Sequence, residues 1–211
     1  MKEIIAFEDF YRRESVEFFK GFVNPSVGVT CMVDGSKCLQ RAKALNEKFF
    51  HHYLYAILRA VNEIEEMHYR FSRAGEIVRY DRIDVITPIK LPGQDHFTTM
   101  KFAYTPSRKD FIAGIKSTID EVQNLSSFGV EDALNEFDVV LLSATPNLPF
   151  TSLTCTQRHS NGNDYPLLNM GQMGADGRMP LAISVHHAFV DGEHLAKFYQ
   201  LVQKYLDSDK E

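Results

Sequence analysis

The most informative absences in this sequence concern long apolar runs, cysteine and an excess of positive charge. No apolar run approaches the roughly 20 residues that a membrane-spanning helix requires, and the first residues lack the apolar segment of a secretory signal. The only cysteines are Cys31, Cys38 and Cys155, which form no CxxC pair and predict reduced thiols in a cytoplasmic protein. The net charge of −5 comes without a basic stripe, which argues against nucleic acid as a partner.

The residues that are present can form one large core. Hydrophobic residues make up 44% of the 211 positions, and phenylalanine alone occurs 16 times. We find no internal repeat and no linker, so we expect a single domain over residues 1–211. Several helical patterns alternate with about eight strand-like patterns, most of them joined by hairpin turns. This mixture predicts an α+β fold with a mixed, largely antiparallel sheet.

The expected elements can be placed by their periodicity and turn residues. We expect helices over Cys38–Lys48 and Phe49–Met67, a helix that Ser107 caps, and a helix that follows Gly192. Hairpin turns are expected at Ala74-Gly75 and Asp176-Gly177. Strands are expected over Val27–Val33, Val139–Leu142, Thr151–Thr156, Leu168–Met173 and Met179–His187, with a loop at Asn161–Asn163. Pro88 predicts that the strand Val85–Leu91 lies at a sheet edge or carries a bulge.

Two tandem histidine pairs stand out. His51 and His52 lie on an expected helix with no third ligand type beside them, so we interpret them as surface or boundary residues. His186 and His187 end an apolar strand and are followed by Asp191 and the helix-entry residue Gly192. Adjacent strand residues point to opposite faces, so one histidine of this second pair can face a cleft while the other packs inward. That arrangement suits a general base, although two structural histidines remain the alternative.

Three further candidate sites could carry chemistry. His187, Asp191 and His194 have helical spacing, but the preceding strand breaks their shared face, so we expect no metal site. Ser143 ends an apolar strand. No GxSxG elbow is present to support a role as nucleophile, so Ser143 either hydrogen-bonds its own turn or donates a hydrogen bond to an oxyanion. For Cys155, nothing local supports a Cys–His pair, and a buried structural thiol is favoured.

The segment His186–Gly192 is an HHxxxDG motif, and it resembles the motif of chloramphenicol acetyltransferases and of the catalytic domains of dihydrolipoamide acyltransferases. The strings YRRESVEFF, EIVRYDRIDV and LLSATP resemble segments of the chloramphenicol acetyltransferase family in the same order, so the resemblance spans nearly the whole chain. It implies the two-layer sandwich of CoA-dependent acyltransferases, in which helices cover the sheet.

The resemblance also implies roles for single residues. His187 would be the general base that deprotonates an acceptor hydroxyl as it attacks the thioester of acetyl-CoA, in a ternary complex without a tightly bound cofactor. Ser143 would donate a hydrogen bond to the oxyanion. Asp191 would pair with Arg12 and brace the active site. Phe19 would line the acceptor pocket, and the assembly would be a homotrimer in which the histidine faces a neighbour's pocket.

The chain departs from the family pattern around the acceptor. It has no tryptophan after Pro146, Phe19 stands where a tyrosine is usual, and Asn169 falls near a threonine position that orders water. We include Asn169 and Cys155 in the substrate-binding set. Chloramphenicol, and with it antibiotic resistance, is the best single expectation. The first alternative is an acyltransferase that uses a different small hydroxyl or thiol acceptor. The second is a protein of the same fold that binds a small ligand without turnover.

Overall fold

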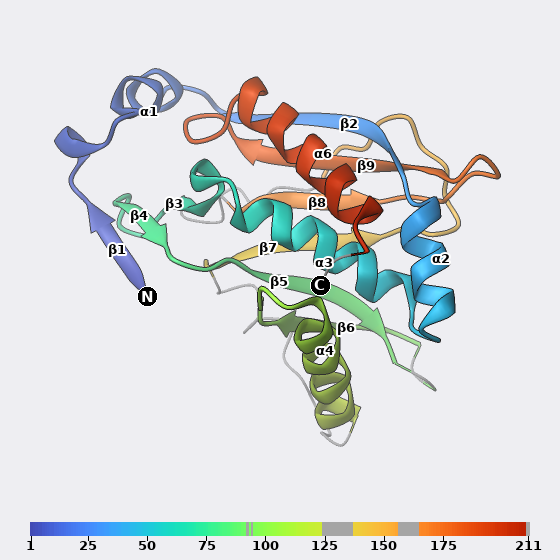
Figure 1. Ribbon diagram of the computed structural model, residues 1–211. Coiled ribbons are helices and arrows are strands. Elements are labelled where there is room, and N and C mark those ends of the chain that lie inside the picture. Colours follow the sequence, from blue (N-terminus) through green and yellow to red (C-terminus); the bar gives the residue numbers. More distant parts are fainter. Residues whose placement is uncertain (92, 94, 124–136, 156–164, 210–211) are drawn as a thin grey trace.

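A computed structural model describes residues 1–91, 93, 95–123, 137–155 and 165–209. Its main sheet has six strands in the order β2-β9-β8-β7-β5-β6 (Figure 1). These strands are β2 (Ser26–Asp34), β9 (Arg178–His186), β8 (Leu167–Met170), β7 (Val139–Ala144), β5 (Asp84–Lys90) and β6 (Phe97–Phe102). Strand β7 runs parallel to β5 and β8, and the other neighbours are antiparallel. The predicted mixed, largely antiparallel sheet is confirmed.

Helices cover one face of this sheet. The helices α3 (Phe49–Asn62) and α6 (Gly192–Asp207) lie side by side across it, and α2 (Ser36–Ala44) lies at their end (Figure 1). Leu181, Ile183 and Val185 of β9 share one buried cluster with residues of α3 and α6, because alternate strand residues face the helices. Helix and sheet therefore form the two expected layers of an α+β sandwich.

A smaller antiparallel sheet, ordered β1-β4-β3, includes part of the N-terminal arm (residues 1–12, before α1). Its strands are β1 (Lys2–Ile5), β4 (Ile77–Tyr80) and β3 (Tyr69–Phe71), with the short helices η1 (Phe7–Asp9), α1 (Arg13–Phe19) and η2 (Glu65–His68) around it. The predicted hairpin between β3 and β4 is present, and Gly75 supplies its turn with a positive φ of 82°.

The strand that contains Pro88 is not at an edge, which corrects the sequence expectation. Strand β5 lies between β7 and β6, but β7 pairs only with Asp84–Ile86. Pro88 pairs with Thr99 of β6 beyond that parallel stretch, where no neighbour on the β7 side needs its missing N–H. A bulge is not needed at Pro88, because this residue lies beyond the part of β5 that pairs with β7.

Other boundaries also differ from expectation. The long helix ends at Asn62 rather than Met67, and η2 follows it. Residues Thr151–Cys155 form no strand, while Thr156 and the expected loop Asn161–Asn163 lie outside the described residues. Helix α4 (Arg108–Gln123) begins as predicted, with the Asp110 amide donating to Ser107 Oγ over 3.2 Å.

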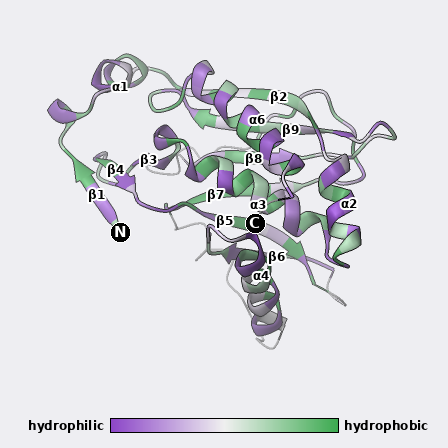
Figure 2. Ribbon diagram, viewed as in Figure 1, coloured by the Kyte–Doolittle hydropathy of each residue, from purple (hydrophilic) through white to green (hydrophobic). Residues whose placement is uncertain are grey.

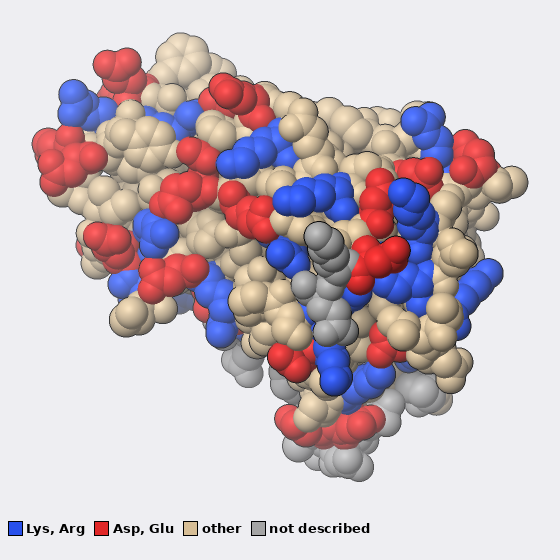
Figure 3. Space-filling view, viewed as in Figure 1, with Lys and Arg blue, Asp and Glu red and all other residues tan. Residues whose placement is uncertain are grey.

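The surface has the mixed character that the composition indicates. Figure 2 shows hydrophilic residues along most of α4, while Phe111, Ile112 and Ile115 are buried hydrophobic residues of this helix. Figure 3 shows lysine and arginine interspersed with aspartate and glutamate over the helical face. None of the described helices is both long and apolar enough to cross a lipid bilayer.

His51 and His52 are core residues, so their placement at the surface was wrong. Their exposed fractions are 3% and 0%. His52 Nε2 lies 2.9 Å from Glu47 Oε2, whereas His51 Nδ1 has no hydrogen-bond partner within the described residues. Burial, together with Lys48 and Lys116, lowers the pKa of His51 to about 4.

This burial predicts that stability falls in mild acid. The unfolded chain binds a proton at His51 near its ordinary pKa, and the folded chain binds one only near pH 4. The contribution of His51 is therefore fully present above about pH 6.5 and is lost toward pH 4, on the order of 2 kcal/mol. We expect the unfolding free energy of His51→Phe to fall less over this range in urea titrations. His96→Phe, at an exposed position, should keep the wild-type slope; equal slopes in both variants would contradict the assignment.

Candidate active site

The loop between β9 and α6 holds His187 by its backbone and by its ring. The His187 N–H donates to Pro25 O over 2.8 Å, just outside the pairing of β2 with β9. His187 Nδ1 lies 3.1 Å from Val190 O. Because a carbonyl only accepts, this hydrogen bond requires the proton on Nδ1 and leaves a lone pair on Nε2. The loop therefore presents an imidazole with its basic nitrogen away from the backbone.

Helix α1 covers one side of this ring. The rings of Phe19 and His187 are stacked, with centroids 4.6 Å apart and an angle of 21° between their planes. Phe19 was predicted from the resemblance to line the acceptor pocket, and the structure places it directly on His187. This contact fixes the plane in which Nε2 can meet a substrate.

Asp191 joins the loop to the N-terminal arm. Its Oδ2 lies 3.0 Å from Arg12 Nη1, and Arg12 Nε donates to Ala188 O over 3.3 Å. Burial of Asp191 raises the pKa of its carboxyl, but the hydrogen bond from Arg12 and the nearby His194 outweigh burial and hold it below its usual value. The predicted ion pair is present, and Arg12, only 15% exposed, is not the solvated basic residue that composition alone suggests.

His186 faces away from its neighbour. Its Nδ1 accepts from the Ala188 N–H over 3.2 Å, and its ring contacts Phe71 and Phe189. Burial, with a smaller effect of His187, lowers the pKa of His186 to about 4, so it is neutral near pH 7. The two histidines are therefore unequal, as their alternation on the strand predicts.

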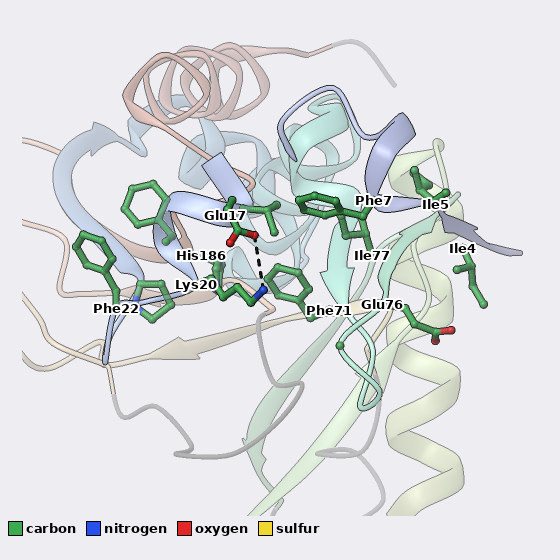
Figure 4. A pocket seen from close by; sticks show the side chains of 15 residues that line it. Ile4, Ile5, Phe7, Glu17, Lys20, Phe22, Phe71, Glu76, Ile77 and His186 are labelled. Atoms are coloured by element: carbon green, nitrogen blue, oxygen red, sulfur yellow. Dashed lines mark ion pairs between the residues drawn. The ribbon is translucent and has the colours of Figure 1, made fainter. Parts of the chain in front are cut away.

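A cavity of about 610 Å³ lies between α1, the N-terminal arm and the hairpin of the small sheet (Figure 4). Its walls are mostly apolar, and His186 and Phe19 belong to them. The ion pair between Glu17 and Lys20, 3.6 Å apart, lies at its side (Figure 4). His187 does not line this cavity, although Phe19, which stacks on its ring, does.

Ser143 and Asn169 lie opposite each other on neighbouring strands, on the sheet face away from α3 and α6. Asn169 is buried and its Oδ1 accepts from Thr145 Oγ1 over 2.9 Å. The Ser143 hydroxyl has no hydrogen-bond partner within the described part of the chain. The alternative that Ser143 is only a turn residue, whose hydroxyl bonds to its own turn, therefore has no support.

One chain does not bring Ser143 and His187 together. Ser143 pairs with Asn169, which pairs with Ala182, five residues before His187. That register separates them by about 17 Å along the strands and about 10 Å across two strand spacings. If both residues act on one substrate, they must come from different copies of the chain.

The remaining candidates lie apart from this loop. Cys155 is a free, half-buried thiol in a segment without regular structure, rather than the buried thiol that we expected; burial raises its pKa. No contact joins it to His187 within the described residues. Helix α6 begins only at Gly192, so His187 does not share a helical face with Asp191 and His194.

Sequence reasoning missed Thr145, and it weighed His194 only as a metal ligand and missed its capping role. Thr145, which orients the Asn169 amide, follows Ser143 by two residues, and that spacing could have indicated it. His194 completes a capping box with Asp191 by accepting the Asp191 N–H over 3.1 Å. Glutamate or glutamine is usual at that position, so the sequence carried no standard capping signal.

Comparisons with known proteins agree over the full length of the chain. The family model for chloramphenicol acetyltransferase matches residues 2–203. The chloramphenicol acetyltransferase of Proteus mirabilis is 27% identical, covering 97% of this chain and 94% of the relative. Chloramphenicol acetyltransferase 2 of Escherichia coli is 24% identical, with 93% of each chain covered.

Solved structures give the same result. A chloramphenicol acetyltransferase structure is 41% identical, covers 98% of this chain and all of its own, and superposes with a TM-score of 0.88. A probable dihydrolipoamide acetyltransferase from Listeria monocytogenes, 16% identical with a TM-score of 0.65 over 99% and 96% of the two chains, shares the fold. The chain is therefore an acyltransferase that belongs to the chloramphenicol acetyltransferase family.

Proposed function

We propose that this protein transfers the acetyl group of acetyl-CoA to a hydroxyl group of a small acceptor, with chloramphenicol as the first candidate. The observation that carries the proposal is the hydrogen bond from His187 Nδ1 to Val190 O, which leaves Nε2 free to accept a proton. The proposed acceptor follows the names of the relatives.

The proposed reaction passes through one tetrahedral intermediate. His187 Nε2 takes the proton of the acceptor hydroxyl as its oxygen attacks the thioester carbonyl carbon. The carbonyl oxygen becomes an oxyanion, which accepts a hydrogen bond from Ser143 Oγ. Collapse expels the thiolate of CoA, which recovers the proton from His187 and leaves the acetyl ester. Phe19 and Val190 keep the imidazole in place throughout.

The separation of Ser143 from His187 within one chain supports a site between two subunits. We propose that the protein is a homotrimer, in which His187 of one subunit meets Ser143 of the next. Asn169 would line the substrate site beside Ser143, since the two residues pair across strands. Cyclic assemblies repeat the same interface at each junction, so a trimer would hold three equivalent sites.

The acceptor is the least constrained part of this proposal. Phe19 has no hydroxyl where the family usually has a tyrosine, so it can contribute only its ring to the acceptor. Cys155 is half-buried and could line the pocket only from a segment away from His187. We retain another small hydroxyl or thiol compound as the alternative acceptor. The three free thiols fit a reducing compartment, and we propose a cytoplasmic location.

A thiol-release assay with acetyl-CoA tests the function. We expect release of CoA that depends on both the protein and chloramphenicol, with a product that is heavier by one acetyl group in mass spectrometry. A panel of other small alcohols and thiols should be run alongside. Turnover with a panel member but not with chloramphenicol would replace the acceptor and keep the chemistry. No turnover with any acceptor would favour a binding protein without catalysis.

A further inference from the structure

We propose that His194, Glu66 and Tyr11 form a second brace on the His187 loop, and that they are positioning residues for the general base. The inference rests on the proposed function of His187, but the contacts that carry it do not. They join the N-terminal end of α6 to η2 and to the segment before α1.

The contacts form a continuous chain. The Asp191 N–H lies 3.1 Å from His194 Nδ1, and His194 Nε2 lies 3.4 Å from Glu66 Oε1. The same Glu66 oxygen accepts from the Tyr11 hydroxyl over 2.7 Å. The side chains of His194 and Glu66 are only 17% and 16% exposed. The contact between His194 and Glu66 is therefore shielded, and bulk water screens it less than an ion pair on the surface, whereas Tyr11 is 62% exposed.

The hydrogen-bond partners of His194 place a proton on its Nε2 in both the neutral and the protonated form of the ring. Nδ1 lies 3.1 Å from the Asp191 N–H and 2.9 Å from Asp191 Oδ1. A neutral ring accepts from the N–H at Nδ1, and a protonated ring donates to the carboxylate there. In both forms Nε2 carries hydrogen and faces Glu66. The contact with Glu66 therefore holds the ring that holds Asp191.

The first and second braces begin at adjacent residues of the sequence. Tyr11 precedes Arg12, and Arg12 reaches Asp191 and Ala188 O directly. Two adjacent residues of the N-terminal arm thus hold the start of α6 from two directions, one by direct contact and one through Glu66 and His194. Asp191 Oδ1 also accepts from the N–H groups of Glu193 and His194 and so caps the helix. The second path ties this capped turn, where the loop that carries His187 ends, to η2 and to the N-terminal arm.

Matched substitutions at His194 separate capping from positioning. In His194→Asn, the amide oxygen can take the place of Nδ1 and accept the Asp191 N–H, but nothing reaches Glu66. In His194→Gln, the longer side chain can reach Glu66 as well. We expect kcat of His194→Asn to fall about five- to tenfold with the KM for acetyl-CoA unchanged. We expect His194→Gln to stay within about twofold of wild type.

Substitutions at Glu66 provide an independent pair. Glu66→Gln keeps an oxygen that can accept from both Tyr11 and His194, whereas Glu66→Ala removes it. We expect Glu66→Ala to match His194→Asn and Glu66→Gln to match wild type. Assays must be made well below each variant's melting temperature, so that a loss of folded protein cannot imitate a fall in kcat.

A spectroscopic measurement separates this proposal from the proposed function. The ¹⁵N shifts of His187 report which ring nitrogen carries the proton, without any turnover. Wild type and the two glutamine variants should show one protonated Nδ1, and His194→Asn and Glu66→Ala should show exchange between tautomers. If the wild-type tautomer persists in every variant and kcat does not change, the second brace is overturned. If wild type has the tautomer but transfers no acetyl group, the proposed function fails and the brace stands.

Discussion

Replacing His187 with alanine is expected to lower kcat for acetyl transfer by about 10⁴, which is the upper range for loss of a general base. The acceptor hydroxyl would then have to lose its proton to water, and no other described side chain stands at the place of Nε2. The stack with Phe19 and the hydrogen bond to Val190 O hold this ring in one orientation, and alanine can make neither contact. CoA release under saturating substrates measures the effect.

His96→Ala is the matched control for this variant. His96 lies at an exposed position before β6, so its loss should leave kcat unchanged. The His187→Ala protein should also keep the elution volume of wild type on size exclusion, because its backbone hydrogen bond to Pro25 O remains. Wild-type turnover by His187→Ala would rule out the proposed mechanism, and an altered elution volume would require a structural explanation instead.

Replacing Ser143 with alanine is expected to lower kcat by about 10²-fold, as for removal of one donor to an oxyanion. The KM values should change little, because the ground-state carbonyl gains less from the donor than the oxyanion does. Ser152→Ala, at an exposed position in the same part of the chain, is the control and should leave kcat unchanged. An unchanged rate in Ser143→Ala would remove Ser143 from the site.

Mixing the two inactive proteins tests whether the site lies between subunits. If His187 of one subunit meets Ser143 of the next, a trimer that contains both variants has one junction with both residues intact. Random reassembly of equal amounts should then restore about a quarter of wild-type activity, since three of four trimers are mixed and each has one working site in three. A site within one chain would give no recovery, as would an assembly that cannot exchange subunits; mass spectrometry of the mixture distinguishes these cases.

Patterns that depend on local geometry were predictable from the sequence. The strand that leads into the two histidines, the helix after Gly192 and the turn at Gly75 all follow from alternation, capping and backbone freedom, and each is present, although the strand ends at His186 rather than His187. The resemblance added the ion pair of Arg12 with Asp191, which joins residues 179 positions apart and which no local pattern contains.

The failures share a physical cause, which is that burial depends on the tertiary fold. His51 and His52 look like boundary residues on a helix, but α3 is covered on both sides and buries them. Pro88 predicts an edge strand, but β5 is an inner strand that tolerates proline because β7 stops pairing with it before that residue. The register that separates Ser143 from His187 depends on β8, which comes between their strands. Sequence reasoning placed both residues in one site without knowing that distance.

The strand order has a consequence for how the protein is made. Strand β2 pairs along all nine of its residues with β9, and strands β3 to β8 lie between them in the sequence. During translation β2 therefore has no partner, and the N-terminal arm cannot contact α6, until β9 and α6 have left the ribosome. Such distant pairing slows folding and leaves strand edges open in the meantime. The loop that carries His187 lies between β9 and α6, so a chain that stops before β9 lacks this loop and carries an unpaired strand.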